Sequence, residues 1–595
     1  MRTTIAAIIA ACLSSVIFTQ AHADDAAVLD GLTINAATRT QTRLEDTLAS
    51  VRVITRDDIE RVQANDVAEI LRFVAGIDVA RTGGPGQQTS LFTRGTESNH
   101  TLVLIDGVRM NPATTGGAAV QNVAPALIER IEIVTGPRSS LYGSDAIGAV
   151  INIVTRANSN DTGGVVSVRA GTNNLQRIHA SARADVGTWR LSGAIDSQRT
   201  GGIPTRSFSD VDRGYDNLSA NVSAARSLAN GEIQLSHWQA GGTTEYADFF
   251  GNPVDQDYEN SVSALEWLQS ITADWDSRVL ISVMRDDIDQ NQSPDFITST
   301  RTTLDWQNTY GGVAGHTLVG GVFVTQENAD AISFGSGFDE DTDINALYMQ
   351  DEFAIGDANA LLAVRISDHD AYGSFFTWNA EIGTAITDTL SLQANLGRAF
   401  RAPDGNDRFG FGGNPELDPE VSNQWQARAI YKPAQAWQFT LEVFNNDIDD
   451  LIEFDFADFT LRNIGRAEIQ GVSLAADWQQ GPWRANLIIN QQSADNADTG
   501  ARLLRRAETS ASLTVSREFG AHNVALAIRS DGDREDFGPV PLAGYMIASV
   551  TAAFEVHPQW QLSLRVDNLT DTEYETAASF RTQGRESAIQ LQYQW

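Results

Sequence analysis

The stretch that decides the fold class is residues 545–566, YMIASVTAAFEVHPQWQLSLRV. From Met546 to Val556 every second residue is apolar, and serine, threonine and glutamate stand among the positions between. After a turn at residues 557–559 the alternation returns from Trp560 to Val566. An apolar residue at every second position is typical of a β-strand with one apolar face. The stretch therefore predicts two antiparallel strands joined by a short turn.

The same alternation recurs from about residue 160 to Trp595, and several of its segments begin with tryptophan directly after a turn. These tryptophans are Trp189, Trp437, Trp483 and Trp560. Tryptophans at one height on successive strands predict the aromatic girdle of an outer-membrane barrel. A soluble barrel or sandwich with core tryptophans is the alternative. It is disfavoured because all 12 tryptophans lie at or after residue 189.

The connections between the expected strands alternate between short turns and long acidic loops, such as residues 210–216, 248–259 and 335–343. This alternation is typical of outer-membrane barrels. About 435 residues follow residue 160, which at roughly 20 residues per strand and connection gives about 22 strands. A barrel of that width needs a plug. We predict an all-β membrane protein, an antiparallel barrel of about 22 strands over residues 158–595.

Residues 41–157 have a different pattern and predict a small α+β plug domain. Residues 57–62 and 66–71 begin with aspartate and carry apolar residues at helical spacing, as capped amphipathic helices do. Residues 101–106 and 128–135 are short β-rich runs, ended by Gly107 and by Gly136-Pro137.

The first 23 residues have the pattern of a secretory signal peptide: a charged start, an apolar run from Ile5 to Phe18, and Ala21-His22-Ala23 before the expected cleavage. The only cysteine, Cys12, lies in this run, so disulfides and thiol chemistry are excluded for the expected mature chain. After the signal no run of about 18 apolar residues predicts a membrane-spanning helix.

The overall composition excludes other classes of protein. The chain has 595 residues, with 77 acidic and 42 basic side chains, and its formal net charge is −35. Binding to nucleic acid requires clustered lysine and arginine, which this chain lacks. Hydrophobic residues make up 42% of the chain, enough for a large ordered protein.

Motifs spread along the chain resemble those of the TonB-dependent outer-membrane receptors. In the plug they are LFTRG at 91–95, LVLIDGVR at 102–109 and GPRSSLYGSDAIGAVINI at 136–153; in the barrel they are FRAP at 400–403, GNPELDPE at 413–420, and DNLTD at 567–571 with the final Trp595. Within the family, the plug motifs, residues 413–425, and residues 574–576 with 584–586 look most like those of cobalamin (vitamin B12) transporters. A shared scaffold does not determine the ligand.

The resemblance implies active import across the bacterial outer membrane by a monomer that borrows energy from the periplasmic partner TonB, with ExbB and ExbD. In the family a short segment near the N-terminus, the TonB box, pairs with that partner by strand addition. The matching residues lie in an expected periplasmic extension at 24–40, and they are Asp30, Gly31, Leu32, Thr33, Ile34, Asn35 and Ala36. The alternative is an ordinary first strand of the plug.

By position, two polar, glycine-rich plug loops are expected to contact the ligand, although ordinary surface loops would have the same composition. The candidate residues are Gln87, Gln88, Thr89, Ser90, Asn111, Thr114 and Thr115. Cobalamin transporters bind calcium in extracellular loops, and carboxylate oxygens are the ligands calcium prefers. The corresponding aspartates are Asp210, Asp212, Asp248, Asp255 and Asp257, although an acidic chain also has aspartate-rich loops for other reasons.

One departure from the family concerns how the plug is held. Receptors commonly pair two plug arginines with two barrel glutamates, but only Arg94 is in place here. The second arginine position is Thr135, and the two acid positions are Gln426 and Ser473. Loss of both partners of a buried ion pair costs little stability, whereas a buried charge left without its partner costs several kcal/mol. We therefore predict a plug seated by neutral hydrogen bonds.

Rival functions differ in the features they require. A ferric-siderophore receptor remains the alternative. A haem receptor is disfavoured because no histidine lies between Pro403 and Asn414. An enzyme is not expected, because His100, His179, His237 and His316 stand alone, without a hydrolase or metalloprotease motif. A passive porin would not explain a plug of some 130 residues, and no catalytic cofactor is implied.

Overall fold

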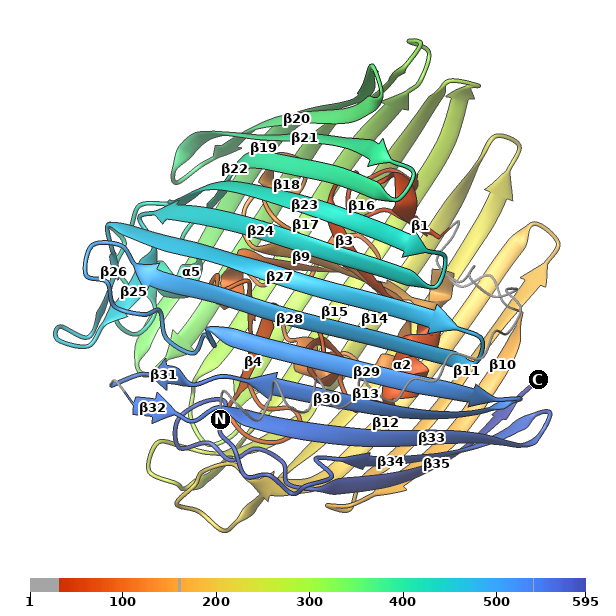
Figure 1. Cartoon of the computed structure of the whole chain (residues 1–595). Coiled ribbons are helices and arrows are strands. Elements are labelled where there is room, and N and C mark those ends of the chain that lie inside the picture. Colours follow the sequence, from red (N-terminus) through yellow and green to blue (C-terminus); the bar gives the residue numbers. More distant parts are fainter. Residues whose placement is uncertain (1–31, 159–161, 539) are drawn as a thin grey trace.

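The computed structural model describes residues 32–158, 162–538 and 540–595. The chain forms a closed antiparallel barrel of 22 strands, with the N-terminal domain inside it (Figure 1). This confirms the predicted fold class. Within the described residues, no helix is long and apolar enough to cross a membrane. The expected signal peptide, residues 1–23, lies outside the described residues.

Each barrel strand pairs with the next along the chain, and the barrel closes where β10 pairs with β35, for example at Val165 and Gln594. The barrel strands are β10 (Gly163–Gly171), β11 (Gln176–Val186), β12 (Trp189–Pro204), β13 (Asp212–Leu228), β14 (Gly231–Ala247), β15 (Pro253–Thr272), β16 (Trp275–Gln290), β17 (Phe296–Tyr310), β18 (His316–Ser333), β19 (Ser336–Ile355), β20 (Ala358–His369), β21 (Gly373–Thr387), β22 (Leu390–Arg401), β23 (Glu420–Ala434), β24 (Trp437–Asp449), β27 (Arg466–Gln480), β28 (Trp483–Asn496), β29 (Thr509–Phe519), β30 (His522–Asp531), β33 (Tyr545–His557), β34 (Trp560–Asp567) and β35 (Glu586–Gln594).

The alternation in the sequence separates an apolar outer face from a more polar lumen. On β33, Met546 and Val556 are 52% and 60% exposed on the outside, whereas Ser549 and Thr551 are buried against the plug side. The four predicted girdle tryptophans are each the first residue of a strand, namely of β12, β24, β28 and β34. They therefore lie together near the rim with the short turns.

The opposite rim carries the long loops, some of which contain structure of their own. The loop after β22 forms helix α5 (Gly405–Phe409), and two other loops form small hairpins, β25 (Ile452–Asp455) with β26 (Thr460–Asn463) and β31 (Arg534–Asp536) with β32 (Val540–Leu542). In this family the long loops face the cell exterior, as the resemblance implies.

The plug is built around a five-stranded sheet in the order β3-β8-β9-β6-β7. Both predicted helices are present because each has a capping side chain: Thr55 accepts from the N–H of Asp58, and Asp66 from that of Glu69. The plug elements are β1 (Thr33–Ile34), β2 (Thr42–Arg43), η1 (Leu44–Asp46), β3 (Ser50–Ile54), α2 (Arg56–Val62), α3 (Val67–Leu71), β4 (Ile77–Arg81), β5 (Thr89–Thr93), η2 (Ser98–His100), β6 (Thr101–Ile105), β7 (Val108–Arg109), η3 (Val120–Asn122), η4 (Pro125–Leu127), β8 (Ile128–Thr135), α4 (Ser139–Tyr142), β9 (Ala149–Thr155) and η5 (Arg156–Asn158).

The prediction that neutral hydrogen bonds seat the plug is wrong. Arg94 forms an ion pair with Glu442 of β24, and Arg138 forms one with Glu381 of β21. The side chains of Arg138 and Glu381 are 0% and 1% exposed. Arg94 keeps its familiar position, whereas its acidic partner and the second ion pair stand at other positions, because a buried arginine is tolerated only with a partner. Gln426 still contributes, accepting a hydrogen bond from Arg94 at 2.8 Å.

Candidate functional site

A cavity lies between the plug and the loop side of the barrel. The barrel contributes residues from β17 to β20, the end of β22 and the loop that contains α5. The plug residues that line the cavity are Arg109, Pro112, Ala113, Gly116, Ser144 and Asp145. The cavity therefore lies where a ligand arriving from the long loops would meet the plug.

The plug loop at the cavity floor is braced by Asn111, which is fully buried. Its side-chain nitrogen donates to the carbonyls of Thr101 (3.0 Å) and Gly116 (2.8 Å), and its side-chain oxygen accepts from the N–H of Val103 (2.8 Å). These three bonds tie both ends of the loop to β6. Asn111 thus shapes the loop, and its polar atoms already have protein partners.

The barrel loop is attached to this plug loop through its backbone. The N–H groups of Gly405 and Asn406 donate to the carbonyls of Ala113 (2.9 Å) and Thr114 (2.8 Å). Gly405 and Asn406 form the first turn of α5, and the side chain of Asp404 caps this turn. Burial and the neighbouring Asp407 hold the pKa of Asp404 well above its usual range. Because of the two backbone hydrogen bonds, movement of the plug loop would displace the barrel loop that contains α5, and the reverse.

Four guanidinium groups line the cavity, and three of them are held by acids. Arg109 pairs with Asp145 at 3.0 Å, Arg301 with Glu327 at 2.6 Å, and Arg401 with Glu420 at 2.8 Å. The fourth, Arg408, lies over the Tyr372 and Phe409 rings, and its buried Nε has no hydrogen-bond partner among the described residues. The buried hydroxyls of Thr114 and Tyr372 are likewise without partners there. Of these three residues, Arg408 lines the cavity and can receive a polar group of a ligand.

Exposed phenylalanines lie on the long loops. Phe334 contacts Phe411 with ring centroids 5.7 Å apart, and Phe456 contacts Phe537 at 5.3 Å. Phe334 is 81% exposed and Phe459 is 61% exposed. Aromatic side chains in this setting offer flat apolar surface to a large ligand.

The structure distributes the predicted plug-loop residues between two roles. Gln88 and Thr115 are exposed, whereas Gln87, Thr89, Asn111 and Thr114 are buried and Ser90 is half-buried. Gln87 donates to the carbonyl of Glu245 at 2.8 Å, which anchors its loop to β14. Contact with a ligand stays a prediction for all seven residues, and it is direct only for the exposed ones.

The five predicted calcium aspartates lie on the long-loop side but have separate partners. Asp210 pairs with Arg581, Asp255 accepts from Asn291 and Gln292, and Asp257 accepts from Thr243. Asp248 accepts from the N–H groups of Phe250 and Asn252, within its own turn. Asp212 is exposed at the start of β13. Across the described ranges, no three acidic, histidine or cysteine side chains gather as a metal site, and calcium stays a prediction.

The predicted TonB-box residues from Leu32 onward are docked against the plug, whereas Asp30 and Gly31 lie outside the described residues. Thr33 and Ile34 form strand β1, which pairs with β2, and Ile34 is fully buried. A few residues later, Arg39 pairs with Asp305 of the barrel wall. The segment is therefore attached both to the plug and to the barrel.

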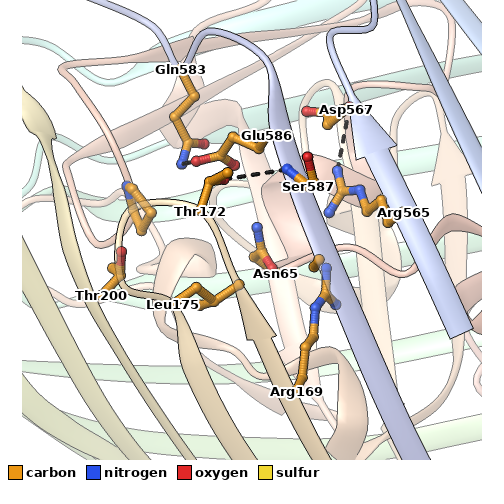
Figure 2. Close-up of a pocket in the computed structure, with 12 residues that line it drawn as sticks. Asn65, Arg169, Thr172, Leu175, Thr200, Arg565, Asp567, Gln583, Glu586 and Ser587 are labelled. Atoms are coloured by element: carbon orange, nitrogen blue, oxygen red, sulfur yellow. Dashed lines mark hydrogen bonds and ion pairs between the residues drawn. The ribbon is translucent and has the colours of Figure 1, made fainter.

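A second, smaller cavity lies where β10 and β35 close the barrel, and Figure 2 shows its lining. Its charged groups are already engaged: Arg565 bonds Glu69 at 2.9 Å, and Glu586 accepts from Gln583 at 2.7 Å. Thr172 and Ser587 join the two strands across it. We interpret it as a gap in the plug–barrel interface.

Comparison with known proteins assigns the chain to a family. Residues 158–569 match the family described as TonB dependent receptor-like, beta-barrel, and residues 43–150 match the TonB-dependent Receptor Plug Domain. The chain belongs to the TonB-dependent receptors, and it is a transporter of the bacterial outer membrane. This family is a class of transporters and receptors, not of enzymes.

Individual relatives are more distant. The chain is 29% identical to a protein named Vitamin B12 transporter BtuB from Photobacterium profundum, over 96% of each chain. Among solved structures, the ferric enterobactin receptor PfeA (mutant G324V) of Pseudomonas aeruginosa matches with a TM-score of 0.81, 15% identity, and coverage of 95% of this chain and 100% of that one. FpvA of P. aeruginosa matches with a TM-score of 0.81, 16% identity, and coverage of 95% and 88%. At these identities the structures show the fold alone.

Sequence reasoning did not find the cavity, although six of its lining residues, Arg109 among them, were in quoted motifs. Asp145 lies in the plug motif at 136–153, and Arg401 lies in the barrel motif at 400–403. Arg301, Glu327 and His369 come from three different strands and carry no local signal. Pairing of neighbouring strands brings these three residues to one part of the wall, and seating of the plug places Arg109 and Asp145 beside them.

Proposed function

We propose that the protein imports cobalamin, or a related corrinoid, across the outer membrane. The observation that carries this proposal is the 29% identity to a vitamin B12 transporter over 96% of both chains. Similarity over the whole length includes the long loops and the plug, where ligand contacts are made in a transporter of this architecture.

The cavity supplies chemistry that suits such a ligand. A corrinoid carries many amide groups around a large ring system, so it needs hydrogen-bond donors and acceptors as well as flat apolar contacts. The guanidinium of Arg408 lines the cavity, and its buried Nε has no hydrogen-bond partner within the described residues. Part of the ligand would enter the cavity, and the exposed Gln88 and Thr115 would contact the remainder.

Energy would come from TonB, with ExbB and ExbD, through the segment around residues 30–36. The support is family membership and the position of this segment, in which Thr33 and Ile34 form strand β1 and pair with β2. Extended segments of this type bind partners by adding a strand to a sheet. Release of the segment would then precede rearrangement of the plug.

The proposal also includes binding of calcium by aspartates of the long loops. Asp248, Asp255 and Asp257 lie on or beside the loop between β14 and β15, with Asp210 and Asp212 before β13 or at its start. Binding of a cation would draw these carboxylates together and order the loops over the ligand.

The test is calorimetric titration of cyanocobalamin into the detergent-solubilised protein, with millimolar calcium and with a chelator. We expect nanomolar affinity with calcium and weaker binding without it. Absence of binding in both conditions would overturn the cobalamin assignment and leave the fold and family unaffected.

A ferric-siderophore receptor is the second candidate, because the exposed phenylalanines at 334, 411, 456 and 459 suit aromatic or planar chelates. Titration of ferric siderophores in the same calorimeter separates the two functions. Binding of a siderophore, with no response to cyanocobalamin, would favour this candidate.

A further inference from the structure

A buried carboxylate holds the N-terminal segment against the plug. Glu132 of β8 is 0% exposed, and its Oε2 accepts from the backbone N–H groups of Asn35 (3.2 Å) and Ala36 (3.0 Å). These two amides belong to the segment that the proposed function assigns to the periplasmic partner. A carboxylate that accepts two consecutive amides imposes one backbone conformation on that stretch.

The same carboxylate is stabilised as an anion by two further donors. Arg130 donates to Oε1 at 2.8 Å, and the side-chain nitrogen of Asn152 lies 3.3 Å from Oε2. With donors on both oxygens, the buried charge of Glu132 is compensated. The side chain therefore stays in place to receive the segment.

Apart from the ion pair of Arg39 with Asp305, which follows residues 34–37, the remaining contacts of the segment are small. Ile34, Ala36 and Ala37 pack in a minor apolar cluster with Ala49 and Val134, separate from the main plug core. The hydroxyl of Tyr142 donates to the carbonyl of Ala36 at 3.1 Å. Because the segment contributes one large and two small apolar side chains, it buries modest apolar area, and charge-assisted hydrogen bonds carry a large share of the docking.

Glu132 is also linked to the hairpin that reaches the ligand cavity. The side-chain oxygen of Asn152 accepts from the N–H of Gly107 at 3.1 Å. Gly107 lies in the turn between β6 and β7, and Arg109, two residues later, lines the cavity. Movement of the β6–β7 hairpin would therefore be transmitted to the Glu132 carboxylate through the side chain of Asn152.

We propose that Glu132 is a positioning residue that keeps residues 35–36 docked and governs their release towards the periplasmic partner. The inference rests on the proposed role of this segment in energy coupling. Loss of the carboxylate leaves the plug sheet in place but frees the segment, because β8 keeps its backbone pairing with β3 and β9.

Thiol accessibility measures this release directly. In the full-length protein with Cys12→Ser, the substitution Ala37→Cys places a reporter at a position that is 0% exposed while the segment is docked. A second protein carries Ala68→Cys, a buried reporter on α3 that detects general loosening of the plug. Maleimide labelling rates of the two proteins are compared with and without Glu132→Gln, in detergent and without ligand or partner.

We expect Glu132→Gln to accelerate labelling at position 37 about tenfold or more, because the amide cannot accept from all four donors. Labelling at position 68 and the thermal midpoint stay unchanged. The matched control Glu60→Gln, at an exposed position of α2, changes neither rate. Glu132→Asp, which keeps the charge but shortens the side chain, gives a smaller acceleration.

Unchanged labelling at position 37 in both Glu132 variants would overturn the proposal. Equal acceleration at positions 37 and 68 would also overturn it, since the residue would then support the plug as a whole. If Glu132→Gln does not fold, the Glu132→Asp protein decides by the same comparison. Neither cobalamin nor TonB is used, so failure here is distinct from failure of the transport proposal.

Discussion

Glu442 lies directly opposite Ser473 in the ladder between β24 and β27, and the carboxylate of Glu442 binds Arg94 of the plug. The acid expected at position 473 has thus been replaced by one on the neighbouring strand, at the same height and facing the same lumen. The plug arginine meets a negative charge in the same region of the wall. Position in the barrel, not position in the sequence, preserves the ion pair.

Removal of one partner of this pair should destabilise the plug. Glu442→Gln leaves Arg94 without its carboxylate, and we expect a loss of about 3 kcal/mol. Arg94→Met combined with Glu442→Met should recover most of it, since neither charge remains buried. Urea unfolding in detergent measures the three proteins. Equal stability of the single variant and the parent would contradict the expectation.

Asn111→Ala should loosen the cavity floor. The substitution removes three hydrogen bonds that tie the loop to β6 and should cost about 1–3 kcal/mol. Cyanocobalamin affinity should fall about tenfold because the loop must be ordered on binding. Asn359→Ala, at an exposed position on the opposite rim, is the control. Unchanged affinity and stability would show that the loop does not depend on Asn111.

Asp78 should make the plug–barrel contact sensitive to pH. Burial, and then the nearby Asp531, raise its pKa from 3.8 to about 6, against the opposing effect of Arg529 and Arg534. Between about pH 4 and pH 6, Asp78 is protonated in the folded protein but ionised in the unfolded chain. The contribution of Asp78 to the free energy of unfolding is therefore complete below about pH 4. It is lost as the pH rises through 6.

Asp78→Asn should remove that loss and raise the thermal midpoint at pH 8 more than at pH 5. The gain in the free energy of unfolding at pH 8 should exceed the gain at pH 5 by on the order of 1 kcal/mol. Thermal unfolding across this pH range measures it, with Asp57→Asn on an exposed helix turn as the control. Parallel pH profiles for the Asp78 variant and the parent would refute the assignment.

Chelation should weaken cobalamin binding if calcium orders the loops. Replacement of both Asp255 and Asp257 by asparagine should abolish this calcium dependence, because amides are weaker ligands than carboxylates. Asp274→Asn, in a short turn of the other rim, should leave it intact. Calorimetry with and without calcium measures all three proteins. A calcium effect that survives in the double variant would place the cation elsewhere.

The barrel was predictable because each strand carries its own signal. Residues 545–566 alternate between lipid and lumen without reference to any distant residue, and Trp560 marks the rim locally. The two plug helices were predictable for the same reason, since each capping side chain is beside the amides it satisfies.

Contacts between strands far apart in sequence were not predictable. Residues 94 and 442 are 348 positions apart, and their pairing depends on the register of the whole barrel. Likewise, the cavity joins Arg109 to Arg301 and Arg408 only after the plug is seated. The sequence by itself determined the barrel, the plug and the family, because local periodicity and motifs encode them. The tertiary structure alone decided which charges hold the plug and where a ligand can enter, because those depend on barrel closure.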